Sequence, residues 1–225
     1  MVAARQLGQQ GKYSVTAAAC GDGPYSLSES MRNVILFAGP QYSSPYFVPY
    51  FIAAYDSVYG DKIPSFQFKR AIVSNLPSFT PPVGSSYPQE LQNLLDGSHS
   101  DVEINDFLRL IQPYLGPRSI LSSEMLVQIA TESSPEVRAL RDNDAFRDWS
   151  PNFPLRMFHN TLDDLVPVGN TRIAAQAFTA GGPWSSEEFL TFVPNLGSIH
   201  AGSLPIAYLK SFNFIDAIAY PERHK

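Results

Sequence analysis

The stretch that decides the fold is Pro154-Leu-Arg-Met-Phe-His-Asn-Thr-Leu-Asp-Asp-Leu-Val-Pro167. Its first half is rich in apolar residues, as in a buried strand, and its second half is a cluster of turn-forming residues. Asp163 and Asp164 therefore follow the carboxyl end of a strand, the edge where ligands and catalytic groups gather in open α/β sheets. The next strand-like run, Phe189-Leu-Thr-Phe-Val193, leads into a loop that carries His200.

An acid after one strand and a histidine after the next are two members of a Ser-His-Asp relay, in the chain order typical of α/β-hydrolases. Asp163 is the candidate acid, because a carboxylate holds the imidazole in one tautomer and stabilises the imidazolium. His200 is the candidate general base and acid, since histidine titrates near neutrality. The glycines beside it, Gly197 and Gly202, predict a sharp, exposed loop. The simpler interpretations are a turn-forming aspartate and a surface histidine.

Residues 154–215 resemble the C-terminal end of an α/β-hydrolase, near the secreted lipase and esterase branch. His159-Asn-Thr-Leu-Asp163-Asp-Leu-Val-Pro167 is similar to the family segment His-Gly-x-x-Asp-x-x-Val-Pro, with Asn160 in place of the usual glycine. Gly197-Ser-Ile-His200-Ala-Gly202 resembles the loop that bears the family's catalytic histidine, and Ala17–Leu27 resembles the strand and turn after the nucleophile helix. The resemblance implies an α/β class chain with a partial α/β-hydrolase fold. It also implies a small-molecule or lipid ester as substrate, no cofactor, and a secreted or periplasmic location.

The nucleophile of that family is the serine of a Gly-x-Ser-x-Gly elbow, and the sequence contains no such pentad. The resemblance places the elbow upstream of Met1, with residues 2–12 as the end of the helix that follows it. Ser26, Ser198 and Ser203 are weak substitutes, because none follows a strand with the elbow's small residues. We therefore expect two members of the relay on this chain and no activity from the chain alone.

This expectation leaves several interpretations open. The chain is a truncated hydrolase, a non-enzymatic binding protein that has kept the fold, or one half of a split enzyme. Peptidase-type relatives use the same relay, so an amide substrate is the alternative to an ester. The first twelve residues lack the apolar core of a signal peptide.

The chain is predicted to consist of a core with an insertion. Residues 1–29 and 149–225 are assigned to the hydrolase core, and residues 30–148 to a helical cap. Within the core, residues 13–20 are small or apolar at nearly every position, which predicts a parallel strand covered on both faces. Its unpaired edge predicts self-association, or pairing with a missing N-terminal half. The other core elements are expected at 154–159, 171–180, 188–193 and 203–219, an alternation typical of parallel sheets.

The cap is expected to begin with an aromatic helix at 46–59. Its apolar residues at helical spacing, which predict one face, are Phe47, Phe51, Ala54, Tyr55 and Val58. This face either lines an acyl pocket or simply packs the cap onto its neighbours. Asn105, Ser122 and Ser134-Pro135 are predicted to begin three further helices.

Composition excludes several other functions. The net charge is −5 and no basic run occurs, so nucleic acid is not an expected partner. No apolar run reaches the length of a membrane span. Cys20 is the single cysteine, so an intrachain disulfide cannot form. Gly21-Asp-Gly-Pro-Tyr-Ser26 begins like a dinucleotide-binding fingerprint but lacks the third glycine.

The remaining polar candidates are given supporting or surface roles. Asp164 is the alternate acid, although solvent exposure or turn support is favoured for it. His159 ends a buried strand and is expected to make structural bonds beneath the site. These two residues could form a metal site with Asp163 and His200, but they lack the helical i, i+4 spacing of a zinc motif, so we predict no metal. The histidines expected at the surface are His99 and His224.

Overall fold

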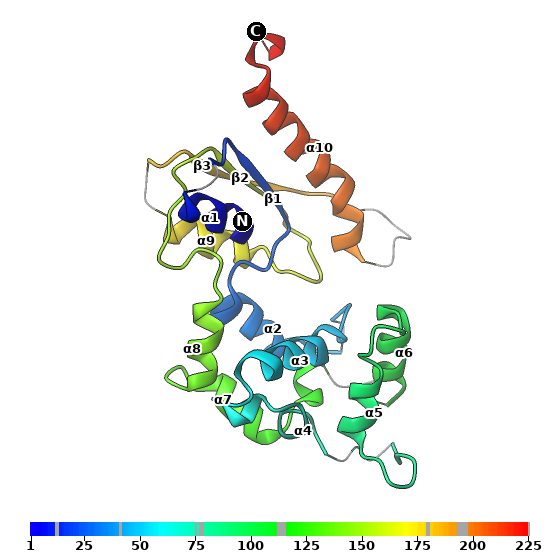
Figure 1. Cartoon of the computed structure of the whole chain (residues 1–225). Helices are drawn as coiled ribbons and strands as arrows, with labels where there is room; N and C mark the ends of the chain where they lie inside the picture. The colour runs from blue at the N-terminus through cyan, green and yellow to red at the C-terminus, as the bar shows by residue number, and fades with distance from the viewer. Residues whose placement is uncertain are drawn as a thin grey trace. The chain divides into compact units, whose positions relative to one another are not determined.

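The computed structural model describes residues 1–11, 14–40, 42–74, 76, 79–111, 116–178, 181–192 and 198–224. The chain divides into two units (Figure 1). The first consists of Met1–Met31 and Arg141–Lys225 and contains the sheet, and the second is Arg32–Leu140 and consists of helices and loops. The sequence had placed the insertion at residues 30–148.

Three parallel strands form the sheet of the first unit, in the order β1-β2-β3. They are β1 (Ala18–Gly21), β2 (Leu155–Asn160) and β3 (Trp184–Phe189). In the central strand, Leu155 pairs with Ala18 on one side and with Trp184 on the other. The alternating order of strands and helices along the core therefore produces the parallel sheet that it predicted.

The outer strands differ from their predicted ranges. β1 begins at Ala18, and residue 13 of the predicted strand lies outside the described residues. The predicted range 188–193 for the last strand was wrong, because β3 ends at Phe189 and leaves Leu190 and Phe192 exposed. β3 starts at Trp184, which pairs with Leu155 of β2 and packs against the buried core cluster, even though the middle of the strand is polar. Residue 193 lies outside the described residues.

Helices lie on both faces of the sheet (Figure 1), and nearly every residue of β2 is buried, as expected for a strand with both faces covered. Leu155 and Met157 belong to a core cluster that includes residues of α1 and α9. On the other face, the Arg156 guanidinium lies 5.9 Å from the ring centroid of Phe214 in α10. Burying side chains such as Leu155 and Met157 stabilises the fold by about 1.5–3 kcal/mol each. The helical elements of this unit are α1 (Val2–Gln10), η1 (Leu27–Met31), α9 (Gly169–Ala177), α10 (Ile199–Ala219) and η4 (Pro221–His224).

Helix α10 begins earlier than predicted. The Oγ of Ser198 accepts a hydrogen bond from the N–H of Ala201 and caps the helix, so that Ile199 is its first residue. His200 therefore lies in the first turn of a helix and not in an exposed loop. Gly202 is buried within the same helix, and Gly197 lies outside the described residues.

The buried face of α10 is lined by small residues. Gly202, Ser203 and Ala207 are buried, whereas Tyr208 and Phe212 are exposed. Small side chains allow the helix to lie close to the sheet: a Cβ on Gly21 of β1 would come within 3.0 Å of the Cβ of Ala207. None of the helices in the described ranges combines the length and apolar character that a membrane span needs.

The second unit is held together by an aromatic and aliphatic core. In α3, the buried residues include Val48, Ile52 and Tyr55, whereas Phe47 and Val58 of the predicted face are exposed. The helix is apolar on most of its circumference, so the packing partner selects the buried side. The elements of this unit are α2 (Arg32–Phe37), α3 (Phe47–Tyr59), η2 (Pro64–Phe66), α4 (Phe68–Ala71), α5 (Tyr87–Asn93), α6 (Asp101–Ile111), η3 (Pro117–Ile120), α7 (Ser123–Ala130) and α8 (Pro135–Asp142), of which α8 extends into the first unit.

Two of the three predicted helix starts in this unit are confirmed. The Oγ of Ser122 accepts from the N–H of Met125 at the start of α7, and Pro135 is the first residue of α8. Asn105 is not a cap, because it lies inside α6 and accepts a hydrogen bond from the backbone of Tyr46.

Within the described residues, β1 has a neighbouring strand on one side only. The N–H groups of Ala18 and Asp22 donate to β2, and such bonds recur at every second residue of a parallel ladder, so the N–H of Ala19 faces the free edge. We predict that the chain self-associates through this edge and that Ala19→Pro lowers the association constant about threefold to tenfold, since about one net hydrogen bond is lost. Light scattering over a concentration series measures it.

Ala18→Pro is the matched control, because it removes a bond within the sheet and is expected to lower the unfolding temperature instead. A chain that stays monomeric at every concentration would contradict the prediction.

Candidate active site

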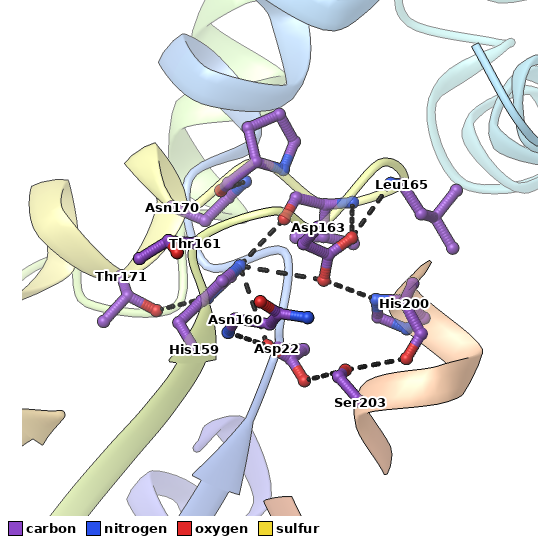
Figure 2. A network of polar contacts seen from close by, with 12 residues as sticks. Asp22, His159, Asn160, Thr161, Asp163, Leu165, Asn170, Thr171, His200 and Ser203 are labelled. Atoms are coloured by element: carbon purple, nitrogen blue, oxygen red, sulfur yellow. Dashed lines mark hydrogen bonds and ion pairs between the residues drawn. The ribbon is translucent and has the colours of Figure 1, made fainter. Parts of the chain in front are cut away.

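A network of polar side chains gathers at the carboxyl edge of the sheet, around the ends of β1 and β2 (Figure 2). Asp22 directly follows β1, and His159 and Asn160 are the last residues of β2. Asp163 lies in the loop after β2, and His200 is in the first turn of α10. The parallel strands end at one edge, which is why residues far apart in the sequence meet there.

The central contact of this network joins Asp163 to His200. The Nδ1 of His200 lies 2.6 Å from Oδ2 of Asp163, whose side chain is completely buried. The other carboxylate oxygen, Oδ1, accepts hydrogen bonds from the backbone N–H groups of Leu165 and Val166, at 2.9 Å and 2.8 Å. The loop therefore fixes one carboxylate oxygen and presents the other to the imidazole. Nδ1 then carries the proton, and Nε2 is the ring nitrogen that can accept one.

The environment of His200 favours its protonated form. The hydrogen bond with Asp163 raises the pKa of His200 above its ordinary value of 6.5, and partial burial of the ring opposes this effect. The negative charges of Asp163, Asp22 and Asp164 add smaller contributions in the same direction as the hydrogen bond. An imidazole in this setting is a stronger base than a free histidine.

Asp164 binds the backbone of the same histidine. Its Oδ1 accepts hydrogen bonds from the N–H of His200 and the hydroxyl of Ser198, both at 3.0 Å. A carboxylate at a helix N-terminus satisfies a free N–H group and interacts favourably with the helix dipole. The neighbouring aspartates thus have different tasks: Asp163 holds the ring of His200, and Asp164 holds its helix turn.

His159 is part of the supporting structure. Its Nε2 lies 2.8 Å from the carbonyl oxygen of Val166, and its Nδ1 lies 2.7 Å from the hydroxyl of Thr171. A carbonyl only accepts, so Nε2 carries the proton and Nδ1 accepts from the threonine. The side chain is completely buried and both nitrogens are occupied. His159 therefore ties the Asp163 loop to α9, in agreement with the structural role predicted for it.

Sequence reasoning missed Asp22 as a member of the network, and it had considered Ser203 only as a weak substitute nucleophile. Asp22 accepts hydrogen bonds from the backbone N–H of Asn160 and from the hydroxyl of Ser203, both at 2.7 Å. The available signal was the position of Asp22 directly after a strand, the same criterion that identified Asp163. The Gly21-Asp22-Gly23 pattern had instead been assessed as part of a nucleotide-binding fingerprint.

Asp22, His159 and Asp163 bring potential metal-ligand atoms within 4.8 Å of one another. The Nε2 of His159 donates its proton to Val166, so this nitrogen has no free lone pair for an ion. The carboxylate oxygens accept hydrogen bonds from backbone N–H groups, a serine hydroxyl and the His200 imidazole. The donor set thus fits a hydrogen-bonded network and does not match a metal centre.

The serines at this edge of the sheet have other partners. The hydroxyl of Ser203 lies 2.7 Å from the carbonyl oxygen of His200, that of Ser198 binds Asp164, and that of Ser26 accepts from the N–H of Ser30. Within the part of the chain that the structure describes, no serine hydroxyl is hydrogen-bonded to the imidazole of His200. The site therefore presents an acid and a base without a serine nucleophile bound to them.

No protein-family model and no curated protein sequence matches the chain. Solved structures do. A protein from Legionella pneumophila assigned as a hydrolase has 19% sequence identity and a TM-score of 0.70, covering 96% of this chain and 52% of its own. The rice cell wall degrading esterase LipA from Xanthomonas oryzae has 17% identity and a TM-score of 0.69, covering 98% of this chain and 55% of its own. A ligand-bound form of LipA matches with a TM-score of 0.67 at 17% identity, over 98% of this chain and 54% of its own.

This chain spans about half the length of the solved structures that it matches. At these identities the likeness is one of fold. The parallel strands, their flanking helices and these neighbours together show that the chain adopts part of an α/β-hydrolase fold.

Asp163→Asn is expected to lower the pKa of His200, because it removes the charged partner that favours the imidazolium. The raised pKa stabilises the folded chain fully below the unfolded value of 6.5, and this stability is lost as the pH rises through the folded pKa. The variant should therefore lose most stability at low pH. NMR titration of His200 and urea unfolding on both sides of that range measure it. In Asp164→Asn the pKa should fall less, and an equal fall in both would contradict the assignment.

His159→Ala is expected to lower the free energy of unfolding by about 2–4 kcal/mol, because it leaves the Thr171 hydroxyl and the Val166 carbonyl without their buried partner. His200→Gln is the control: the His200 side chain is 21% exposed and the glutamine amide can still donate to the buried Asp163 carboxylate, so a cost of about 1 kcal/mol or less is expected above the pKa of His200. Urea unfolding at alkaline pH compares them, and equal losses would argue against the division into supporting and reactive histidines.

Proposed function

We propose that the chain supplies the acid and the base of a serine hydrolase that cleaves carboxylic esters. The observation that carries the proposal is the 2.6 Å contact between the Nδ1 of His200 and the buried carboxylate of Asp163. This is the orientation in which a carboxylate prepares an imidazole to remove a proton from a hydroxyl. The fold supports the same reaction class, because neighbours with this architecture include an esterase.

In the proposed reaction, the nucleophilic serine lies on polypeptide outside residues 1–225. The Nε2 of His200 takes the proton of that hydroxyl while the serine oxygen attacks the ester carbonyl. Asp163 stabilises the imidazolium that forms. His200 then gives the proton to the departing alcohol, and the same steps with water release the acid. Backbone donors for the oxyanion would also come from that polypeptide.

The proposed mechanism requires neutral His200, so the rate should rise with pH through its raised pKa. The raised pKa makes Nε2 a better proton acceptor, and it moves the onset of activity to higher pH. The buried Asp163 would keep its orientation through the cycle, because its oxygens bind backbone N–H groups and the imidazole. The helical unit Arg32–Leu140 would act as the cap of the enzyme.

The test uses the protein together with the polypeptides that accompany it in its source cells, purified through a tag on this chain. A fluorophosphonate probe is expected to label a serine outside residues 1–225, and the preparation should hydrolyse a nitrophenyl ester. His200→Gln should lower turnover about 10⁴-fold, because both proton transfers lose their carrier. The isolated chain should neither label nor turn over.

His224→Gln is the matched control, since His224 is also bonded to an aspartate, Asp216, but lies on an exposed 3₁₀ turn. Its turnover should equal that of the parent. Labelling of a serine within residues 1–225 would contradict the proposed division of the relay. A preparation that neither labels nor hydrolyses the ester would favour the alternative that the fold serves as a binding protein.

A further inference from the structure

Three different atoms of His200 make contacts that lead to three different carboxylates. Figure 2 shows the contact with Asp163 and the one through Ser203 to Asp22. Asp163 binds the His200 ring at Nδ1, and Asp164 accepts from the backbone N–H of His200. The hydroxyl of Ser203 lies 2.7 Å from the carbonyl oxygen of His200 and 2.7 Å from Oδ2 of Asp22, so its one proton is shared between these two acceptors. Asp163 and Asp164 come from the loop after β2, whereas Asp22 comes from the end of β1. The contact through Ser203 therefore connects His200 to a different strand from the one that precedes Asp163 and Asp164.

Pro205 weakens the hydrogen bonding of α10 close to its first turn, so side-chain contacts become more important for the position of that turn. Proline has no backbone N–H, so residue 205 cannot donate to the carbonyl of Ala201, and the helical ladder is interrupted just after the turn that carries His200. The rest of α10 therefore gives this turn less support than an uninterrupted helix would. Ser203 lies between His200 and Pro205, and its side chain is fixed to Asp22.

The Asp22 end of this contact is rigid. Asp22 is buried, and its N–H donates to the carbonyl of Phe158 at 2.9 Å. Its φ of 43° is unusual for a residue other than glycine and ends the strand. A Cβ on the adjacent Gly21 would come within 3.0 Å of Ala207, one helical turn beyond Ser203 on the same face of α10, so the glycine allows this close approach of the helix to the sheet. Close packing at Ala207 and the hydrogen bond at Ser203 together fix the position of α10 on the sheet.

We propose that Asp22 and Ser203 are positioning residues for His200, acting through its backbone to keep the imidazole aligned with Asp163. The inference rests on the proposed function only for its consequence in catalysis, because the geometry belongs to the chain itself. The charged groups around the ring are Asp163, Asp164 and Asp22, from two strand ends. Asp22 has a second, electrostatic effect, since its charge favours the imidazolium.

The test measures His200 directly by NMR in the full chain, without any need for turnover. The two quantities are the exchange rate of the Nδ1 proton with water and the pKa of the ring, with His200→Gln used to assign the signals. Ser203→Ala is expected to raise the exchange rate about fivefold to tenfold, as for the loss of about one net hydrogen bond, and to lower the pKa. Ser186→Ala, an exposed serine on β3, should change neither.

Asp22→Asn separates position from charge. The amide can still accept from Asn160 with its oxygen and can donate to Ser203 with its nitrogen. The slow exchange of the Nδ1 proton should therefore be retained, while the pKa falls because one nearby negative charge is gone. Should Ser203→Ala not fold, Ser203→Cys replaces it, since its weaker donor should give a smaller rise in exchange.

The outcomes distinguish this inference from the proposed function. A parent chain without a protected Nδ1 proton or a raised pKa on His200 would contradict the acid–base pair itself. A parent with both properties that are unchanged in folded Ser203→Ala or Ser203→Cys would overturn the positioning role and leave the pair intact. Faster exchange in folded Asp22→Asn, equal to that in Ser203→Ala, would show that an amide bonded to Ser203 does not keep the imidazole in place, and would overturn the positioning role assigned to Asp22.

Discussion

A buried carboxylate is tolerated only when hydrogen bonds replace the water that it has lost, and this constraint shapes the site around Asp163. The chain meets it by turning back after β2, so that Leu165 and Val166 present their N–H groups to one carboxylate oxygen. The second oxygen is left for a partner that can carry a proton, and His200 is that partner. The loop is itself braced from below, because His159 bonds to the carbonyl of Val166 and to Thr171 of α9.

The sheet brings these groups together, because parallel strands deliver their carboxyl ends to one edge. β2 carries the acid, β1 carries Asp22, and the first turn of α10 lies against both strands through its small residues. Close packing at Gly21 and Ala207 has the further effect of bringing the Ser203 hydroxyl within reach of Asp22. Packing and hydrogen bonding thus act on consecutive turns of the same helix.

Much of this was visible in local patterns. The buried strand at 154–159, the acid after it, and His200 after the next strand were all identified from apolar runs and turn residues. The predicted element boundaries were wrong where contacts with distant residues outweighed the local preference of the sequence. The run at 188–193 is the more apolar, yet β3 forms at Trp184–Phe189, because its register is set by Leu155 of β2. The start of α10 was placed too late, because Ser198 and Asp164 together begin the helix before His200.

The sequence by itself determined which residue types follow the core strands, and hence that carboxylates and imidazoles are present at this edge. It could do so because a strand and the turn after it are contiguous in the sequence. Only the tertiary structure decided which polar groups meet. Asp22 and Ser203 are separated by most of the chain, and their contact depends on how closely a helix lies against a sheet edge. That distance is a property of packing between distant segments, so no local pattern records it.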